Sequence, residues 1–206
     1  MSVLYTTVAK EAHAEQTIEK SRFISHIYRV ESREDAEAII ASLRAQYRDA
    51  SHNVPAMVIG DRMQLQWASD DGEPSGTSGA PMLQMLVKEG ITNVLVVVTR
   101  YFGGIKLGPG GLVRAYTGSA RMALEAAGRY DVRGVRVLEL SIPYSLLDTL
   151  MFMESRLPFT SANVRYTDKV TLDLVYEPEH EDQILAELSN LIGGPVDTSS
   201  LRDEIR

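Results

Sequence analysis

The chain has 206 residues, of which 44% are hydrophobic and 24% are charged. This suits one large domain or two small ones, each with a packed core. The absence of cysteine excludes disulfides, thiolate catalysis and cysteine-ligated metal sites, and it fits a reducing compartment. The amino-terminal stretch has no secretory pattern, and the longest strongly apolar run, Val94–Val98, is too short to cross a bilayer. We therefore expect a soluble, cytoplasmic protein with no membrane partner.

The net charge of −7 is distributed unevenly along the chain. Residues 1–130 carry 14 basic and 14 acidic residues, whereas residues 131–206 carry 7 and 14. Between Gly90 and Leu124 no acidic residue occurs, while four basic residues do: Arg100, Lys106, Arg114 and Arg121. A basic segment in an acidic protein indicates either an anion site or four solvated charges that fell together by chance.

The first 130 residues are expected to alternate between strands and helices. The stretch 15–30 predicts one strand with a bend, and Ser32 predicts the N-cap of a helix. Further strands are expected at 53–60, 63–69 and 91–102, and helices at 81–90 and from about 112 to 127. On the last helix one apolar face consists of Leu112, Tyr116, Ala120 and Ala123.

The remainder of the chain predicts a second domain. The polar stretch GRYDVRG, Gly128–Gly134, interrupts the periodicity and favours a domain boundary. A strand, a helix, two strands joined by a turn at Thr167–Lys169, a helix and a last strand within 195–205 follow. This order is the ferredoxin-like βαββαβ pattern. The domain is acidic and has no catalytic constellation.

The stretch GGIKLGPGG, Gly103–Gly111, has five glycines in nine residues between a strand and a helix. Backbone amides at a helix amino end can bind phosphate, and Arg100, Lys106 and Arg114 are close in sequence. The stretch lacks the P-loop and dinucleotide-binding fingerprints. A phosphate or nucleic-acid site and a purely structural turn with close strand–helix packing both remain open.

The loop SDDGEPSGTSGAP, Ser69–Pro81, offers the oxygen donors that a hard cation prefers. Its acids are Asp70, Asp71 and Glu73. The alternatives are a surface loop held by its own turns, or pairing of these acids with Arg100 or Lys106 if the two loops meet. Serine nucleophile chemistry is disfavoured because no nucleophile elbow is present.

The four histidines, His13, His26, His52 and His180, show no zinc-binding spacing. Only His52, just before a strand, is near the candidate loops. The aromatics near these loops, Trp67, Tyr101 and Phe102, could stack on bases, although aromatics in strands more often belong to a core.

Two long motifs, SDDGEPSGTSGAPML and VVVTRYFGGIKLGPGGLVRAYT, together with KSRFI at Lys20–Ile24, resemble the signature of the IMPACT family, whose bacterial members are often named after YigZ. The resemblance covers essentially the whole chain. It implies an α+β, two-domain fold: an IMPACT-type domain at 1–130, similar to the second domain of a small-subunit ribosomal protein, and a ferredoxin-like domain at 134–206, similar to domain V of elongation factor G.

The resemblance also implies a role in translation. Eukaryotic relatives inhibit a general amino-acid control kinase, but they carry an additional RWD domain that this sequence does not contain, so we do not extend the kinase role to it. The leading hypothesis is a non-enzymatic regulator or binding protein that contacts RNA, the ribosome or a protein partner, with no cofactor. The alternative is an enzyme that holds a metal with loop 70–78 and phosphate with loop 103–111. The expected binding residues are Arg22, Asp70, Asp71, Glu73, Thr77, Arg100, Tyr101, Gly103, Gly104, Lys106, Gly108, Gly110, Gly111 and Arg114.

Overall fold

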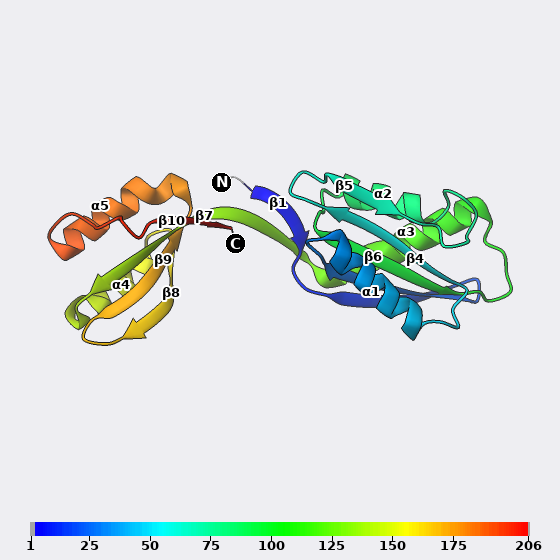
Figure 1. The fold of residues 1–206 in the computed structure, drawn as a ribbon, viewed down its shortest axis with the longest axis horizontal. Helices are drawn as coiled ribbons and strands as arrows, with labels where there is room; N and C mark the ends of the chain where they lie inside the picture. Colours follow the sequence, from blue (N-terminus) through cyan, green and yellow to red (C-terminus); the bar gives the residue numbers. More distant parts are fainter. Residues whose placement is uncertain (1–2, 206) are drawn as a thin grey trace. The chain divides into compact units, whose positions relative to one another are not determined.

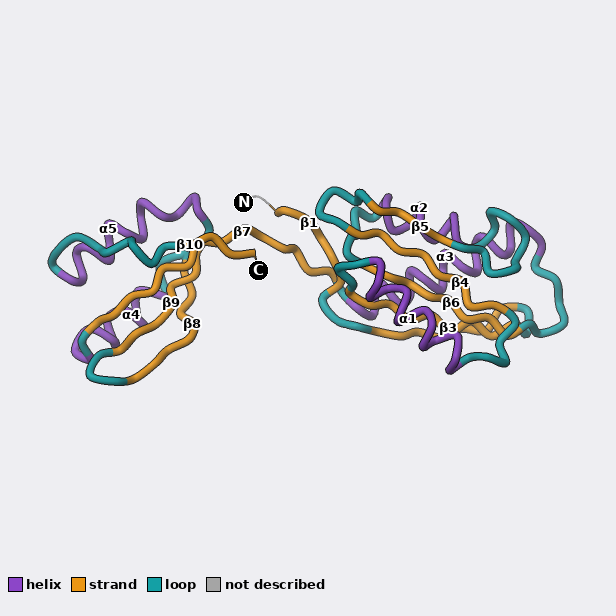
Figure 2. The backbone as a smooth tube through the Cα atoms, viewed as in Figure 1, coloured by secondary structure: helices purple, strands orange, loops and turns teal. Residues whose placement is uncertain are grey.

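The computed structural model describes residues 3–205 and shows a mixed α and β fold with two sheets (Figures 1 and 2). In chain order the elements are β1 (Val3–Val8), β2 (Ala12–Ile18), β3 (Ser21–Arg29), α1 (Arg33–Gln46), β4 (His52–Ile59), β5 (Leu65–Ala68), α2 (Gly79–Lys88), β6 (Val94–Tyr101), α3 (Gly108–Ala127), β7 (Arg129–Ile142), α4 (Leu147–Glu154), β8 (Phe159–Tyr166), β9 (Val170–Tyr176), α5 (Glu181–Ile192) and β10 (Arg202–Ile205). No helix within residues 3–205 is long and apolar enough to cross a membrane.

The chain divides into two compact units, Tyr5–Asp131 and residues 132–205 together with residues 3 and 4. We refer to them as the N-terminal and C-terminal units. The division falls inside β7 and within Gly128–Gly134, the stretch where the sequence favours a domain boundary. These polar residues form a strand because pairing uses backbone groups, and Gly134–Val137 pair with β10.

The N-terminal unit is built on an antiparallel sheet in the order β2-β3-β6-β4-β5. Helix α1 covers one face, where it packs against Met57, Leu95 and Val97. Helices α2 and α3 cover the other face, against Val96, Val98 and their neighbours (Figure 1). Strand β6 is central and buried on both faces, which explains its almost uninterrupted run of β-branched residues.

The stretch 15–30 is not one bent strand, as its sequence suggests, but parts of two strands, β2 and β3, joined by a tight turn. Ile18 pairs with Ser21 across this turn, and both turn residues, Glu19 and Lys20, have positive φ angles of 46° and 63°. Such a turn usually shows Asn or Gly in the sequence. Because neither is present, the hairpin could not be recognised. Strand β1 was also not expected.

Helix α3 begins at Gly108, so the last part of the glycine-rich stretch forms its first turn instead of a loop. Pro109 lies in this first turn, where its missing N–H costs no hydrogen bond. The expected apolar face of α3 is confirmed: Leu112, Tyr116, Ala120 and Ala123 are all buried. The N-cap role of Ser32 in α1 is also confirmed, because its side chain accepts a hydrogen bond from the N–H of Asp35.

The C-terminal unit contains the expected βαββαβ order, β7-α4-β8-β9-α5-β10, and the hairpin turn at Thr167–Lys169. Its sheet order is β10-β7-β9-β8, which places the first and third strands side by side, as in ferredoxin-like folds. Strand β1 also pairs with β7. Helices α4 and α5 pack on the same sheet face through Leu150, Ile184 and Leu188.

Candidate functional site

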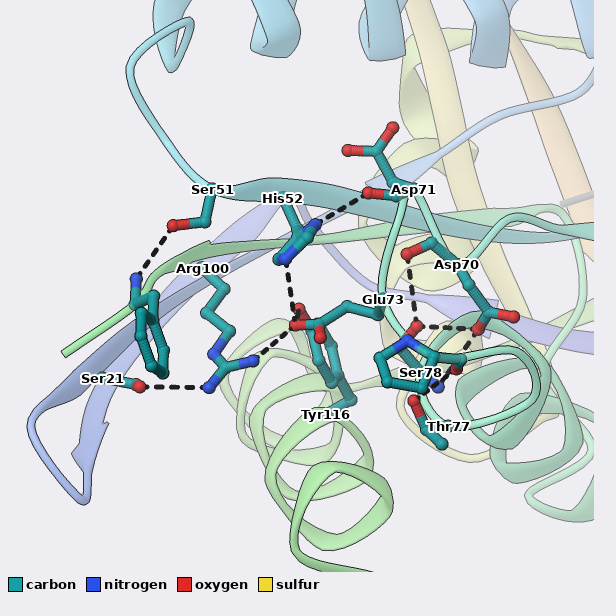
Figure 3. A network of polar contacts seen from close by, with 12 residues as sticks. Ser21, Ser51, His52, Asp70, Asp71, Glu73, Thr77, Ser78, Arg100 and Tyr116 are labelled. Carbon is teal, nitrogen blue, oxygen red and sulfur yellow. Dashed lines mark hydrogen bonds and ion pairs between the residues drawn. The ribbon is translucent and has the colours of Figure 1, made fainter. Parts of the chain in front are cut away.

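A buried ion pair joins the acidic loop to strand β6. Arg100 Nη1 donates a 2.7 Å hydrogen bond to Glu73 Oε1, and the two side chains are only 5% and 4% exposed. The hydroxyl of Tyr116, from α3, donates to the same oxygen at 2.7 Å (Figure 3). The pairing of an acid of this loop with Arg100, one of the alternatives left open by the sequence, is therefore observed.

Arg100 is held on several sides. Its Nη2 donates to Ser21 Oγ at 3.2 Å, and its guanidinium lies 5.4 Å from the ring centre of Phe23 and 5.3 Å from that of Phe102. Since Glu73 neutralises its charge, Arg100 forms part of a site wall and is not a free phosphate-binding cation.

His52 lies against the same carboxylate. Its Nδ1 donates to the backbone carbonyl of Asp71 at 2.8 Å, since a carbonyl can only accept. Its Nε2 is then 3.7 Å from Glu73 Oε1, close enough for an ion pair when the ring is protonated. His52 is the only histidine that the sequence placed near the candidate loops.

The hydroxyl of Tyr116 stays protonated at all ordinary pH values. Burial raises the pKa of Tyr116 far above its usual value, and the hydrogen bond to the Glu73 carboxylate raises it further. Tyr116 is therefore a permanent donor that holds Glu73 in place.

A pocket of about 360 Å³ opens beside this network. We call it the Glu73 pocket. It is lined by His52, Glu73, Pro74, Arg100, Phe102, Lys106, Leu107, Gly108, Pro109 and Leu112. The two loops singled out from the sequence thus supply one wall each, and the amino end of α3 contributes to the lining.

A second hollow, of about 500 Å³, also lies at the amino-terminal part of α3 and shares Lys106 and Leu107 with the Glu73 pocket. We call it the Arg114 cleft. Its lining residues are Ile18, Glu19, Ile105, Lys106, Leu107, Gly111, Arg114 and Ala115.

The four basic residues of the acid-free segment have different environments. Arg100 pairs with Glu73, and Arg121 pairs with Glu89 at 2.6 Å. Within residues 3–205, Lys106 and Arg114 form no ion pair, and both line the Arg114 cleft. Only these two are available to an outside anion.

The glycines of the stretch 103–111 meet different structural requirements. A Cβ on Gly103 would lie 2.0 Å from the backbone of Lys20, so this glycine allows the β2–β3 turn to approach closely. Gly104 and Gly108 have φ angles of 88° and 70°, which other residues adopt at a cost. A Cβ on Gly111 would be only 3.0 Å from that of Leu107, whereas one on Gly110 would meet nothing within 4 Å. The fold itself therefore does not require a glycine at 110.

The acidic loop is organised by Asp70. Its carboxylate accepts hydrogen bonds from the N–H groups of Gly76, Ser78 and Gly79. It also accepts one from the Ser78 hydroxyl (Figure 3). Burial alone would raise the pKa of Asp70, but these hydrogen bonds outweigh it and hold the pKa below its usual value. Asp70 therefore fixes the loop and the first turn of α2.

The metal alternative finds no support in the positions of these acids. Asp71 accepts from Arg44 Nη2 at 2.8 Å and from the N–H of Asn53 at 2.6 Å, while Asp70 and Glu73 are engaged as described. No cluster of three histidine or carboxylate side chains that could hold a metal ion occurs within residues 3–205.

Replacing Asp70 with asparagine is expected to lower the free energy of unfolding by about 1–2 kcal/mol at pH 7, because charge-assisted hydrogen bonds are lost. The folded-state pKa of Asp70 is lowered, so its contribution is present above the unfolded-state pKa of about 4 and disappears as the pH falls through the folded-state value. Urea unfolding at pH 7 and near pH 3 measures this. Glu125→Gln, on the exposed side of α3, is the control. A difference between wild type and Asp70→Asn that does not shrink in acid would contradict this role.

Several residues expected from the sequence lie outside both hollows. Arg22 pairs with Glu15 at 2.7 Å on the surface of the β2–β3 hairpin, and the Tyr101 hydroxyl donates to Asp49. The Thr77 hydroxyl donates to the carbonyl of Pro74 within its own loop. Their part in binding stays a prediction.

The apolar part of the Glu73 pocket could hardly be recognised from the sequence. Phe102 is 49% exposed, and Leu107, Pro109 and Leu112 complete much of the wall. Pro109 and Leu112 resemble ordinary helix-start and core residues in the sequence. Of these residues, only Phe102 was named as a candidate from the sequence, because it is an aromatic residue directly before the glycines.

A known protein domain matches the part of the chain that contains the Glu73 pocket. The Impact N-terminal domain matches residues 19–124, a range that contains all residues of the Glu73 pocket. The IMPACT family member YvyE of Bacillus subtilis is 37% identical over 193 residues, which cover 94% of this chain and 89% of that protein. The chain belongs to the IMPACT family.

Other relatives extend the comparison. The IMPACT family member YigZ of Escherichia coli is 47% identical over 112 residues, which span 53% of this chain and 54% of YigZ. A crystal structure described as a hypothetical protein covers 97% of this chain and 95% of its own, with 32% identity and a TM-score of 0.58. The similarity to YvyE and to this crystal structure therefore extends beyond the matched IMPACT domain into the C-terminal unit.

Proposed function

We propose that this IMPACT-family protein acts in translation as a non-enzymatic binding protein and that it contacts RNA through the glycine-rich stretch at the amino end of α3. The observation that carries the proposal is the pair of cations at this end, Lys106 and Arg114, which have no ion-pair partner within residues 3–205 and line one cleft.

The backbone at this position favours the same ligand. Helix α3 has no side-chain cap, and the first N–H groups of a helix have no partner within it. Pro109 has no N–H, so Gly108 and Gly110 present the available donors. These N–H groups and the positive end of the helix dipole attract anions such as phosphate. The glycine at 110, which the fold does not require, would allow a phosphate to approach the backbone.

The overall charge of −7 limits the kind of contact. An acidic protein repels RNA at long range, but at physiological salt such repulsion is screened beyond about 8 Å. The contact would therefore be local, involve few phosphates and depend strongly on salt. Translation is the context that the IMPACT resemblance implies, and RNA is the translation component that fits unpaired cations and free amides.

A salt titration tests the proposal. Binding of a short structured RNA and of purified ribosomes is measured for wild type and for the Lys106→Ala/Arg114→Ala variant. The dependence of log affinity on log salt concentration is expected to flatten by about one unit for each cation removed. Arg121→Ala is the matched control, because this cation belongs to the same helix but is paired with Glu89. It should leave the slope unchanged.

Two results would contradict the proposal. One is an unchanged slope in the double variant. The other is the absence of binding by the wild type at low salt, where electrostatic contacts are strongest; that result would favour a protein partner instead. An enzymatic function is less well supported, because it needs metal ligands from the acidic loop and those carboxylates already accept hydrogen bonds from the protein.

A further inference from the structure

We propose that the Glu73 pocket binds a single nucleobase that carries an amino group, with the attached phosphate at the amino end of α3. This inference rests on the proposed function, since it names the part of the RNA that the site would recognise. It assigns the pocket to the base, while Lys106 is shared with the Arg114 cleft.

One buried polar atom at the pocket has no partner. Arg100 Nε is buried without a hydrogen bond, and the Arg100 side chain is only 5% exposed and lines the pocket. An unpaired buried donor is costly and rare, so it points to a ligand that supplies an acceptor. Beside it, Glu73 Oε1 accepts from Arg100 and Tyr116, whereas Oε2 accepts no hydrogen bond from the described part of the chain and remains open to a donor.

The wall of the pocket suits a flat ring. Phe102 packs near the Arg100 guanidinium at 5.3 Å and is still 49% exposed. Pro74, Leu107 and Leu112 add apolar surface. An exposed aromatic side chain in an apolar recess is a stacking platform, and every nucleobase has a face that can stack on it.

The charges at the pocket indicate a ligand with a negative group at one end. Arg100 and Glu73 neutralise each other, whereas Lys106 adds an unpaired positive charge. The free N–H groups of Gly108 and Gly110 lie at the same end of α3. Phosphate alone would leave Glu73 Oε2 and the apolar wall unused. An apolar peptide would leave the polar floor and Lys106 without partners. A nucleotide satisfies all three parts.

The free carboxylate oxygen discriminates between bases. Adenine, guanine and cytosine each have an amino group that can donate to Glu73 Oε2. Uracil in a nucleotide has a single N–H, flanked by two carbonyl groups. One of them can accept from Arg100 Nε, but the other would face the Glu73 carboxylate, which repels it. We therefore expect amino-bearing bases to bind more tightly than uracil.

Titrations of the full chain with mononucleotides test the proposal. Binding is measured by calorimetry or NMR. The probes are AMP, GMP, CMP, UMP and inorganic phosphate. At least one of the three amino-bearing nucleotides should bind about five-fold or more tightly than UMP, and all of them more tightly than phosphate. Phe102→Ala should weaken nucleotide binding about ten-fold through loss of stacking. Tyr144→Ala, another half-exposed aromatic but in the C-terminal unit, is the matched control and should change nothing.

Three results would overturn the inference: equal affinity for UMP and the other nucleotides, phosphate binding as tightly as nucleotides, or unchanged affinity in Phe102→Ala. Thermal unfolding shows whether each variant is folded. If Phe102→Ala is not, Phe102→Leu keeps an apolar side chain and removes the aromatic ring.

An RNA arm separates this inference from the proposed function. Oligoadenylate and oligouridylate are compared for wild type, Phe102→Ala and Lys106→Ala/Arg114→Ala. One outcome is RNA affinity that falls in Lys106→Ala/Arg114→Ala but is unchanged in Phe102→Ala and equal for the two oligonucleotides. It would overturn the pocket assignment and leave the proposed function intact. Base-selective nucleotide binding without any RNA binding would support the pocket and contradict the proposed function.

Discussion

Replacing Glu73 with alanine is expected to lower the free energy of unfolding by about 3–5 kcal/mol, because it leaves the buried guanidinium of Arg100 without a counter-charge. The hydroxyl of Tyr116 loses its acceptor as well. Since the pair joins the acidic loop to strand β6, the loss should open the Glu73 pocket and loosen the acidic loop. Urea unfolding of the full chain, followed at a probe in the N-terminal unit, measures the change.

The matched control is Glu15→Ala. This removes a carboxylate–arginine pair of similar geometry, Glu15 with Arg22 at 2.7 Å, whose side chains are 45% and 52% exposed. Exposed pairs contribute about 0–1 kcal/mol, so the two variants should differ several-fold. A Glu73→Ala variant no less stable than Glu15→Ala would contradict the structural role given to the buried pair.

Replacing Gly103 with alanine is the second change with a large expected effect. The new methyl group would lie 2.0 Å from the backbone carbonyl of Lys20 and 2.5 Å from the N–H nitrogen of Ser21. These are backbone atoms and cannot rotate away as a side chain would. The β2–β3 turn would have to move, at a cost of about 3 kcal/mol, measured by chemical or thermal unfolding.

Gly110→Ala provides the comparison within the same stretch. Here the methyl group meets nothing within 4 Å, and alanine favours a helix by up to about 1 kcal/mol over glycine. The variant should be as stable as wild type or slightly more stable, while its affinity for RNA falls, because the methyl group covers the backbone donors. If Gly103→Ala and Gly110→Ala are equally stable, the close approach at Lys20 does not constrain the turn.

Much of the fold could be predicted from the sequence because burial leaves a pattern. Strand β6 is buried on both faces and appears as a run of valines. Helix α3 buries one face, so Leu112, Tyr116 and Ala120 recur at helical spacing. The β2–β3 turn was missed because Glu19 and Lys20 adopt positive φ angles without the residues that usually announce such a turn.

The two loops of the candidate site were predicted from the sequence, but the contact between their residues was not. The sequence identified both loops, and it left open whether their charges meet. Pairing of Arg100 with an acid of the loop was one of the alternatives, and Arg100 meets Glu73 because the fold brings β6 and the acidic loop together. A contact between residues 27 positions apart has no signature in local periodicity. The apolar wall of the Glu73 pocket could not be predicted for the same reason.

The most direct test of the account is an RNA titration of the isotope-labelled full chain followed by amide NMR shifts. We predict that the largest changes occur at the free N–H groups of Gly108 and Gly110 and at Lys106 and Arg114, with further changes at Phe102. Shifts confined to the C-terminal unit, or no saturable shifts at low salt, would contradict the assignment of the binding site to the amino end of α3.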